Sequence, residues 1–147
     1  MLPLKKLLVT TDFSALSQEG IKVAGELASA YSSEVILLHV IPESHVLASS
    51  GVSSGKVQDY YGELIRVAEK SLKEIAETEF KKDLSVSPRV IQGNPPDEIV
   101  KLASEQKVDL IVMSTRGTSG LAAYTAGSVA VKVAGRAPCP VMVVPGA

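Results

Sequence analysis

The sequence has a single cysteine, no tryptophan, and phenylalanine and tyrosine as only 4% of its 147 residues. Because Cys139 has no second cysteine to pair with, an internal disulfide and a multi-cysteine metal site are excluded. An excess of charge is also missing, since 15 Lys and Arg stand against 16 Asp and Glu without a block of one sign. Proteins that bind nucleic acid or anionic membranes usually carry a basic patch. We therefore expect neither as a partner.

Long apolar runs are absent as well. Stretches such as Val35–Leu38 and Leu110–Met113 are strand-sized and far shorter than a membrane span. Met1–Lys6 leads into the first apolar run without the longer apolar stretch of a signal peptide. The length suits one domain. We therefore expect residues 1–147 to form a single cytoplasmic domain.

Five short apolar segments predict strands. Leu4–Thr11 and Glu34–Ile41 are apolar at consecutive positions, which is typical of strands covered on both faces in a parallel sheet. Ser85–Gln92, Asp109–Ser114 and Pro140–Val144 complete the set.

Helical periodicity or helix-start residues separate these strands. The pattern predicts helices near 17–31, 57–82, 95–106 and 128–134, with Ser14 or Ser17 capping the first. Asn94-Pro95 is a strong helix start, and Gly135 is the expected left-handed end of the last helix. Two loops are expected, Pro42–Lys56, which is rich in serine, and Thr115–Ala126.

Alternating strands and helices predict an α/β fold. We expect a doubly wound, Rossmann-like, five-stranded parallel sheet of order 3-2-1-4-5 with helices on both faces. Ligands of such sheets bind beyond the carboxyl ends of the strands, where the strand order reverses. With the first and fourth strands adjacent, the residues there would be Thr10-Thr11-Asp12 and Ser114–Gly127.

The segment from Ser114 to Val129 is the most informative part of the chain. It begins where a strand ends and closes where a helix begins, and Gly117 permits close approach of the backbone to a ligand. Gly127-Ser128 would bring free amide hydrogens, a hydroxyl and the positive end of a helix dipole together, which suits a phosphate group. A flexible loop with an ordinary serine cap is the alternative, and composition does not separate the two.

The same segment resembles the signature of the universal stress protein family, which reads Gly, two residues, Gly, nine residues, Gly-Ser or Gly-Thr. Gly117 and Gly127-Ser128 match it, while Ser114 stands at the first glycine. The resemblance extends to Thr10–Ser14, Gly93–Ile99 and Ala137–Val144, in the same order along the chain.

This resemblance implies an adenine-nucleotide-binding α/β domain that acts in stress adaptation or signalling, commonly as a homodimer. The ligand would be ATP, with AMP as the alternative, and its phosphates would hold Mg²⁺ or Mn²⁺. The resemblance places adenine and ribose by Thr10, Thr11, Asp12 and the backbone of Val40, the ribose and α-phosphate by Met113, Ser114 and Gly117, and the outer phosphates by Gly127, Ser128, Val129 and Ala130. Arg116 would either add positive charge or point to solvent.

Two of these residues allow a second interpretation. The Cβ and hydroxyl of Ser114 could crowd the ligand, or the hydroxyl could donate a hydrogen bond to it. Asp12 could cap the helix that follows through backbone amides near Ser14. We favour ligand contact for Asp12 because it lies at the expected switch point.

Other motifs fail on spacing or context. Gly51–Lys56 has three residues where a P-loop has four, and Val57 replaces its Ser or Thr. The Gly-x-Ser-x-Gly pattern around Ser53 lacks a preceding strand and a later histidine, so a serine hydrolase is a distant third hypothesis. His39 is expected to be packed or hydrogen-bonded within its strand. We predict no catalytic residue and no protein metal site, and at most slow ATP hydrolysis.

The last strand is expected at a sheet edge between Pro140 and Pro145. Antiparallel pairing of residues 141–144 across a two-fold axis would give a homodimer, while an edge covered by its own loops is the alternative. A dimeric protein-interaction module of the same fold without a nucleotide remains the second functional hypothesis.

Overall fold

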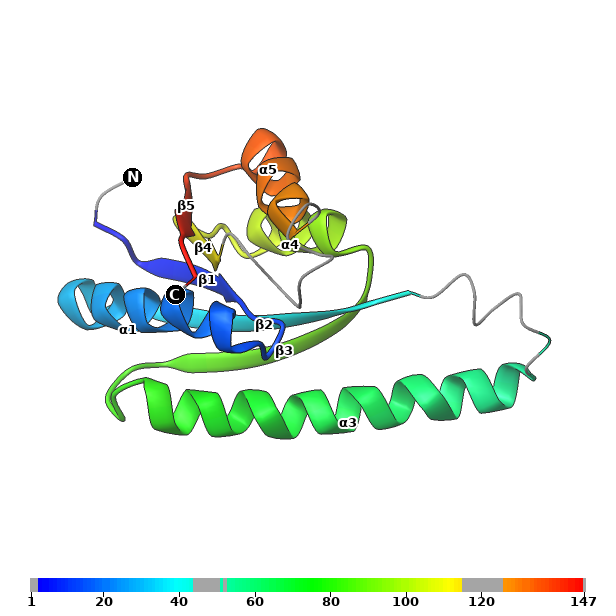
Figure 1. Ribbon diagram of the computed structural model, residues 1–147. Coiled ribbons are helices and arrows are strands. Elements are labelled where there is room, and N and C mark those ends of the chain that lie inside the picture. The colour runs from blue at the N-terminus through cyan, green and yellow to red at the C-terminus, as the bar shows by residue number, and fades with distance from the viewer. Residues whose placement is uncertain (1–2, 44–50, 52, 115–125, 147) are drawn as a thin grey trace.

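The computed structural model describes residues 3–43, 51, 53–114 and 126–146 (Figure 1). Its strands are β1 (Lys6–Thr10), β2 (Glu34–Pro42), β3 (Val86–Gly93), β4 (Leu110–Ser114) and β5 (Val141–Val144). Its α-helices are α1 (Gln18–Tyr31), α3 (Ser54–Glu79), α4 (Pro95–Glu105) and α5 (Ala126–Arg136), and a short 3₁₀ helix spans Ala15–Ser17.

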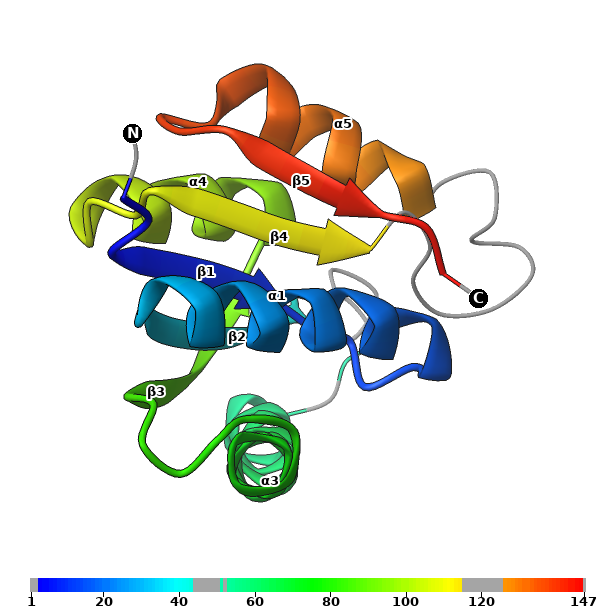
Figure 2. The same cartoon turned by 90° about the vertical axis from the view of Figure 1, so that its left-hand side faces the viewer.

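The five strands form one parallel sheet of order β3-β2-β1-β4-β5. Figures 1 and 2 show α1 and α3 on one face of this sheet and α4 and α5 on the other. The predicted fold class and strand order are therefore confirmed. Because the order reverses at β1, the crevice between the carboxyl ends of β1 and β4 is the switch point at which a ligand is expected.

Two hydrophobic clusters hold the layers together. On the α1 side, Leu7 and Val9 of β1 pack with Ile21 of α1 and Leu72 of α3. On the α4 and α5 side, Leu8 packs with side chains of both of those helices. Alternate residues of a strand point to opposite faces, so a central strand covered on both faces must be apolar at consecutive positions. The run Leu7-Leu8-Val9, which is fully buried, satisfies this requirement.

Several helix limits differ from the predicted ones. Helix α3 begins at Ser54 rather than near Val57, because the Ser53 hydroxyl accepts a hydrogen bond from the Lys56 amide as an N-cap. The predicted loop therefore loses its last three residues to this helix. Helix α5 runs to Arg136, so the predicted left-handed end at Gly135 is wrong. Gly135 lies inside the helix, and it is not among the positive-φ residues of the described chain.

No helix in the described parts of the chain combines the length and the apolar character needed to cross a membrane.

Candidate functional site

The carboxyl end of β1 leads into a turn that local hydrogen bonds hold in shape. Thr11 is buried, and its Oγ1 accepts a hydrogen bond from the Phe13 amide at 3.0 Å and lies 3.0 Å from Ser17 Oγ. The Ser17 hydroxyl donates its hydrogen to the Ser14 carbonyl, so Thr11 must be the donor to Ser17. The Ser14 hydroxyl caps the 3₁₀ helix by accepting from the Ser17 amide. Of the two predicted caps, Ser14 makes a capping bond and Ser17 does not.

Asp12 lies in the middle of this turn and is half-buried. Its Oδ1 accepts a hydrogen bond of 2.9 Å from the Ser14 amide. This bond forms an Asx turn ahead of the 3₁₀ helix, whose cap is Ser14, so Asp12 shapes the turn and does not itself cap the helix. Within the described residues no hydrogen bond occupies Oδ2, so the second carboxylate oxygen is available to another partner. The local role and ligand contact are therefore compatible.

His39, on β2, contacts the same turn. Its Nδ1 lies 2.7 Å from the Thr11 carbonyl oxygen, and its ring stacks on Phe13 with centroids 4.4 Å apart. Burial lowers the pKa of His39 below its ordinary value, although the hydrogen bond to Thr11 and the charge of Asp12 oppose the shift. His39 was expected to be packed or hydrogen-bonded, and it is both, although its hydrogen bond reaches the turn after β1 and not its own strand.

At the carboxyl end of β4, the side chain of Ser114 turns towards α1. A Cβ added at Gly20 would lie 2.9 Å from Ser114 Oγ, so the serine occupies the space that the glycine leaves. Within the described part of the chain, this Oγ is buried and has no hydrogen-bond partner. The hydroxyl is therefore buried against the first turn of α1.

Helix α5 begins at the same end of the sheet, as the strand arrows of Figure 2 show. Ala126, Gly127 and Ser128 are its first three residues. The first amide groups of an α-helix have no acceptor within the helix, and they lie at the positive end of its dipole. The predicted phosphate residues Gly127 and Ser128 therefore stand where free backbone donors are expected.

The remaining predicted residues divide into three groups. Thr10 and Val40 are half-buried near the carboxyl ends of β1 and β2. Met113 and Ala130 are buried in the core cluster on the α4 and α5 side, and the half-buried Val129 packs against that cluster, so Met113 and Ala130 could meet a ligand only through their backbone. Arg116 and Gly117 lie outside the described residues.

The sequence-based site omitted Gly20, Phe13 and His39, which the structure brings against the predicted residues. Gly20 could have been found from its place in the first turn of a helix that must pack on the strand ending at Ser114. Phe13 has a φ of +67°, a conformation that is uncommon for a bulky residue and that the sequence does not reveal.

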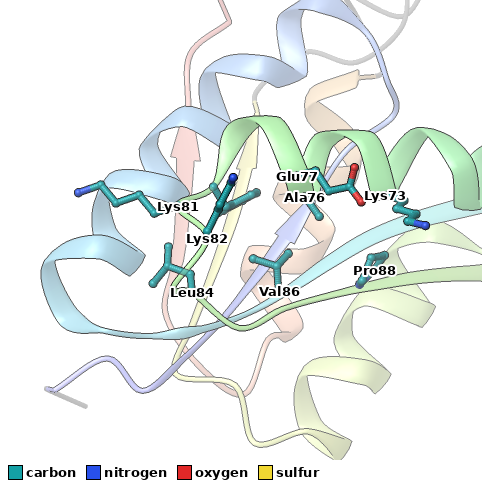
Figure 3. Close-up of a pocket in the computed structure, with 9 residues that line it drawn as sticks. Lys73, Ala76, Glu77, Lys81, Lys82, Leu84, Val86 and Pro88 are labelled. Carbon is teal, nitrogen blue, oxygen red and sulfur yellow. The ribbon is translucent and has the colours of Figure 1, made fainter.

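A separate hollow of about 480 Å³ lies between the end of α3 and the edge strand β3 (Figure 3). Val86 and Pro88 of β3 line it on one side and Lys73, Ala76 and Glu77 of α3 on the other. These β3 residues belong to the amino-terminal half of the strand. The hollow is thus distant from the crevice where the predicted site residues gather.

No group of three or more His, Cys, Asp or Glu side chains suited to a metal ion is found among the described residues.

Comparison with known proteins agrees with this architecture. The sequence profile of the Universal stress protein family matches residues 3–145. The chain belongs to this family. It is similar to Universal stress protein YxiE of Bacillus subtilis, with 34% identity over 144 residues that cover 95% of this chain and 97% of the relative.

Two solved structures of universal stress proteins extend the comparison. The structure of MJ0577 from Methanocaldococcus jannaschii superposes with a TM-score of 0.84 at 30% identity and covers 98% of this chain and 97% of its own. A universal stress protein in complex with cAMP superposes with a TM-score of 0.71 at 26% identity and covers 98% and 99%.

Proposed function

We propose that this universal stress protein binds an adenine nucleotide at the crevice between β1 and β4 and acts as a stress-response or regulatory protein. The ligand is ATP, with AMP as the alternative, and its phosphates carry Mg²⁺ or Mn²⁺. Adenine and ribose lie by Thr10, Thr11, Asp12 and Val40. The phosphates lie against the first turn of α5.

The observation that carries this proposal is the meeting of three features at one end of the sheet. Strands β1 and β4 are adjacent, the Asp12 turn follows the first of them, and α5 begins beyond the second. A polyanion fits this arrangement because the first amide groups of an α-helix have no acceptor within the helix and lie at the positive end of its dipole. Ser114 does not oppose it, since its hydroxyl is buried against Gly20.

The cAMP complex of a related universal stress protein supports the ligand class. It has the same fold as this chain over nearly its whole length, and its ligand contains adenine, ribose and a phosphate. We carry over the class of ligand, an adenine nucleotide, and leave the number of phosphates to experiment.

Hydrolysis should be slow at this site. Residues 126–136, which form α5 and contain the proposed phosphate contacts, include no Asp, Glu or His side chain that could act as a general base beside the phosphates. A general base needs to reach the proton that it removes, directly or through one water. We therefore propose a binding protein rather than an efficient ATPase.

Isothermal titration with ATP, AMP and cAMP, each with and without Mg²⁺, tests the proposal. We expect ATP to bind. Gly127→Val should weaken ATP binding by at least about tenfold, because the new side chain would keep the phosphates from one or two backbone amides, and this is the effect of losing that many hydrogen bonds to a charged group. Gly62→Val is the matched control, because Gly62 is a helical glycine of α3 with open space around it. Equal ATP affinity of the two variants would contradict the phosphate site.

The second candidate is a protein-interaction module of the same fold without a nucleotide. It is favoured by Ser114, which departs from the family's glycine pattern. Denaturing the purified protein should then release no adenine nucleotide, and none of the three titrations should give heat. A copurified adenine nucleotide would exclude this candidate.

We also propose a homodimer through β5. Met142 and Val143 are each 37% exposed on this edge strand. Apolar strands at a sheet edge tend to pair with another chain. Antiparallel pairing with the β5 of a second copy would cover them.

A further inference from the structure

Both backbone polar groups of Thr11 are hydrogen-bonded to residues of β2. The Thr11 amide donates to the Leu38 carbonyl at 3.0 Å, and the Thr11 carbonyl oxygen lies 2.7 Å from His39 Nδ1. The first of these bonds continues the β1–β2 ladder by one residue. The second is made by a side chain, and it falls on the peptide bond that joins Thr11 to Asp12.

This contact fixes the tautomer of His39. A carbonyl oxygen can only accept a hydrogen bond, so Nδ1 must carry the hydrogen. In the neutral ring Nε2 is then without a hydrogen. The lowered pKa favours this neutral form near pH 7.

Phe13 secures the ring from the other side. Its backbone has a φ of +67°, which costs of order 1–3 kcal/mol for a residue other than glycine unless the surroundings compensate. The contact between the Phe13 and His39 rings, at 4.4 Å and an interplanar angle of 38°, and the bond from the Phe13 amide to Thr11 Oγ1 supply that compensation. Asp12 is therefore fixed between two residues that both contact His39.

From this geometry we infer that His39 is a positioning residue for nucleotide binding, which presents the Asp12 carboxylate at the crevice by donating a hydrogen bond from Nδ1 to the Thr11 carbonyl. The inference rests on the proposed function, because it assumes that Asp12 contacts the nucleotide. It assigns His39 no contact with the ligand. The essential feature of the side chain is a donor at the Nδ1 position.

A pair of substitutions separates the donor from the bulk of the ring. His39→Asn keeps an N–H donor near the place of Nδ1, whereas His39→Leu keeps an apolar side chain and removes the donor. We expect His39→Leu to weaken ATP binding about fivefold, the effect of one hydrogen bond, and His39→Asn to restore most of this loss. Leu102→Val, a core substitution in α4 on the opposite face of the sheet from α1, controls for loss of stability alone.

The ring nitrogens give a readout that does not depend on a nucleotide. A long-range ¹H–¹⁵N spectrum should show the Nδ1–H tautomer for one of the two histidines, and this signal should disappear in His39→Asn. In His39→Leu the Ser14 amide, which donates to Asp12, should exchange its hydrogen faster than in the parent protein.

An Nε2–H tautomer at His39 would overturn the inference. So would an ATP affinity in His39→Leu equal to that of the parent, or one in His39→Asn as low as in His39→Leu. If the parent binds no nucleotide, the proposed function fails by itself. The tautomer and the Ser14 exchange rate then still decide whether His39 holds the Asp12 turn, because slow Ser14 exchange in His39→Leu would contradict it.

Discussion

Ser114 and Gly20 illustrate how two small residues in contact depend on each other. The serine hydroxyl is buried without a hydrogen-bond partner, and it fills the space beside the glycine. An unpaired buried hydroxyl costs of order 1–3 kcal/mol. At the position of the signature glycine, the serine hydroxyl is thus accommodated by a glycine on the neighbouring helix.

A double-mutant cycle tests this coupling. Gly20→Ala should destabilise the parent protein, because the new methyl group would lie 2.9 Å from Ser114 Oγ and force the serine into another rotamer. In the Ser114→Ala background the same change should stabilise the fold by up to about 1 kcal/mol, the helix preference of alanine over glycine. Urea unfolding of the four proteins measures both effects. Additive effects of the two substitutions would show that the residues are independent.

The pKa of His39 predicts how stability depends on pH. Burial lowers this pKa in the folded state below the ordinary value of 6.5, so the unfolded chain binds the proton more tightly. The contribution of the neutral ring is complete above pH 6.5 and is lost as the pH falls from 6.5 through the folded-state pKa. Unfolding free energies between pH 8 and pH 5 should therefore decrease more in the parent than in His39→Asn. Parallel curves would contradict this prediction.

At the scale of elements, the start of α4 was the most predictable feature of the chain. Asn94 is the N-cap, its Oδ1 accepts from the Asp97 amide at 3.3 Å, and Pro95 is the first helical residue, as the sequence indicated. The start of α3 was missed because Ser53 lies among other serines, and composition does not identify which of them caps a helix. The end of α5 was predicted wrongly at Gly135, because a glycine near a helix end does not have to adopt positive φ.

Substitution of the cap should lower the stability of the whole domain. We expect Asn94→Ala to reduce the free energy of unfolding by about 1 kcal/mol, because the Asp97 amide loses its acceptor. Asn94→Asp keeps an oxygen acceptor and should remain close to the parent. Urea denaturation of both variants measures the difference. Equal losses in the two variants would indicate that the side-chain oxygen of Asn94 does not stabilise α4.

At the scale of the whole molecule, the parallel order of the sheet could be predicted because five short strand segments alternate with four helical segments along the chain. The same reasoning located the crevice through Thr10–Asp12 and Ser114. The direction of the Ser114 hydroxyl and the contact between His39 and Thr11 could not be predicted from the sequence. Both depend on which faces of separate elements meet, and Gly20 and Ser114 are far apart in the sequence.

The proposed dimer gives a prediction at the same scale. Val143→Glu should convert a dimer into a monomer in light scattering, because a carboxylate on the paired edge would have to lose its water without a partner. Val67→Glu on α3 is the control, because Val67 is an exposed valine on a helix that packs on β2 and β3, near the edge of the sheet opposite β5. A monomeric parent protein, or a Val143→Glu variant that remains dimeric, would contradict pairing through β5.

Pro88, which lines the hollow beside α3, also bears on how the outer edge of β3 can pair. The Val35 amide donates to the Ser85 carbonyl, so alternation along the parallel ladder turns the backbone of Pro88 away from β2, to the outside. Proline has no N–H to offer there, so this margin cannot supply an unbroken row of donors to an incoming strand. If β5 joins two copies, the outermost strands of the resulting ten-stranded sheet are both β3. The missing donor at Pro88 then disfavours addition of a further strand at either end, and with it edge-to-edge growth into a fibre.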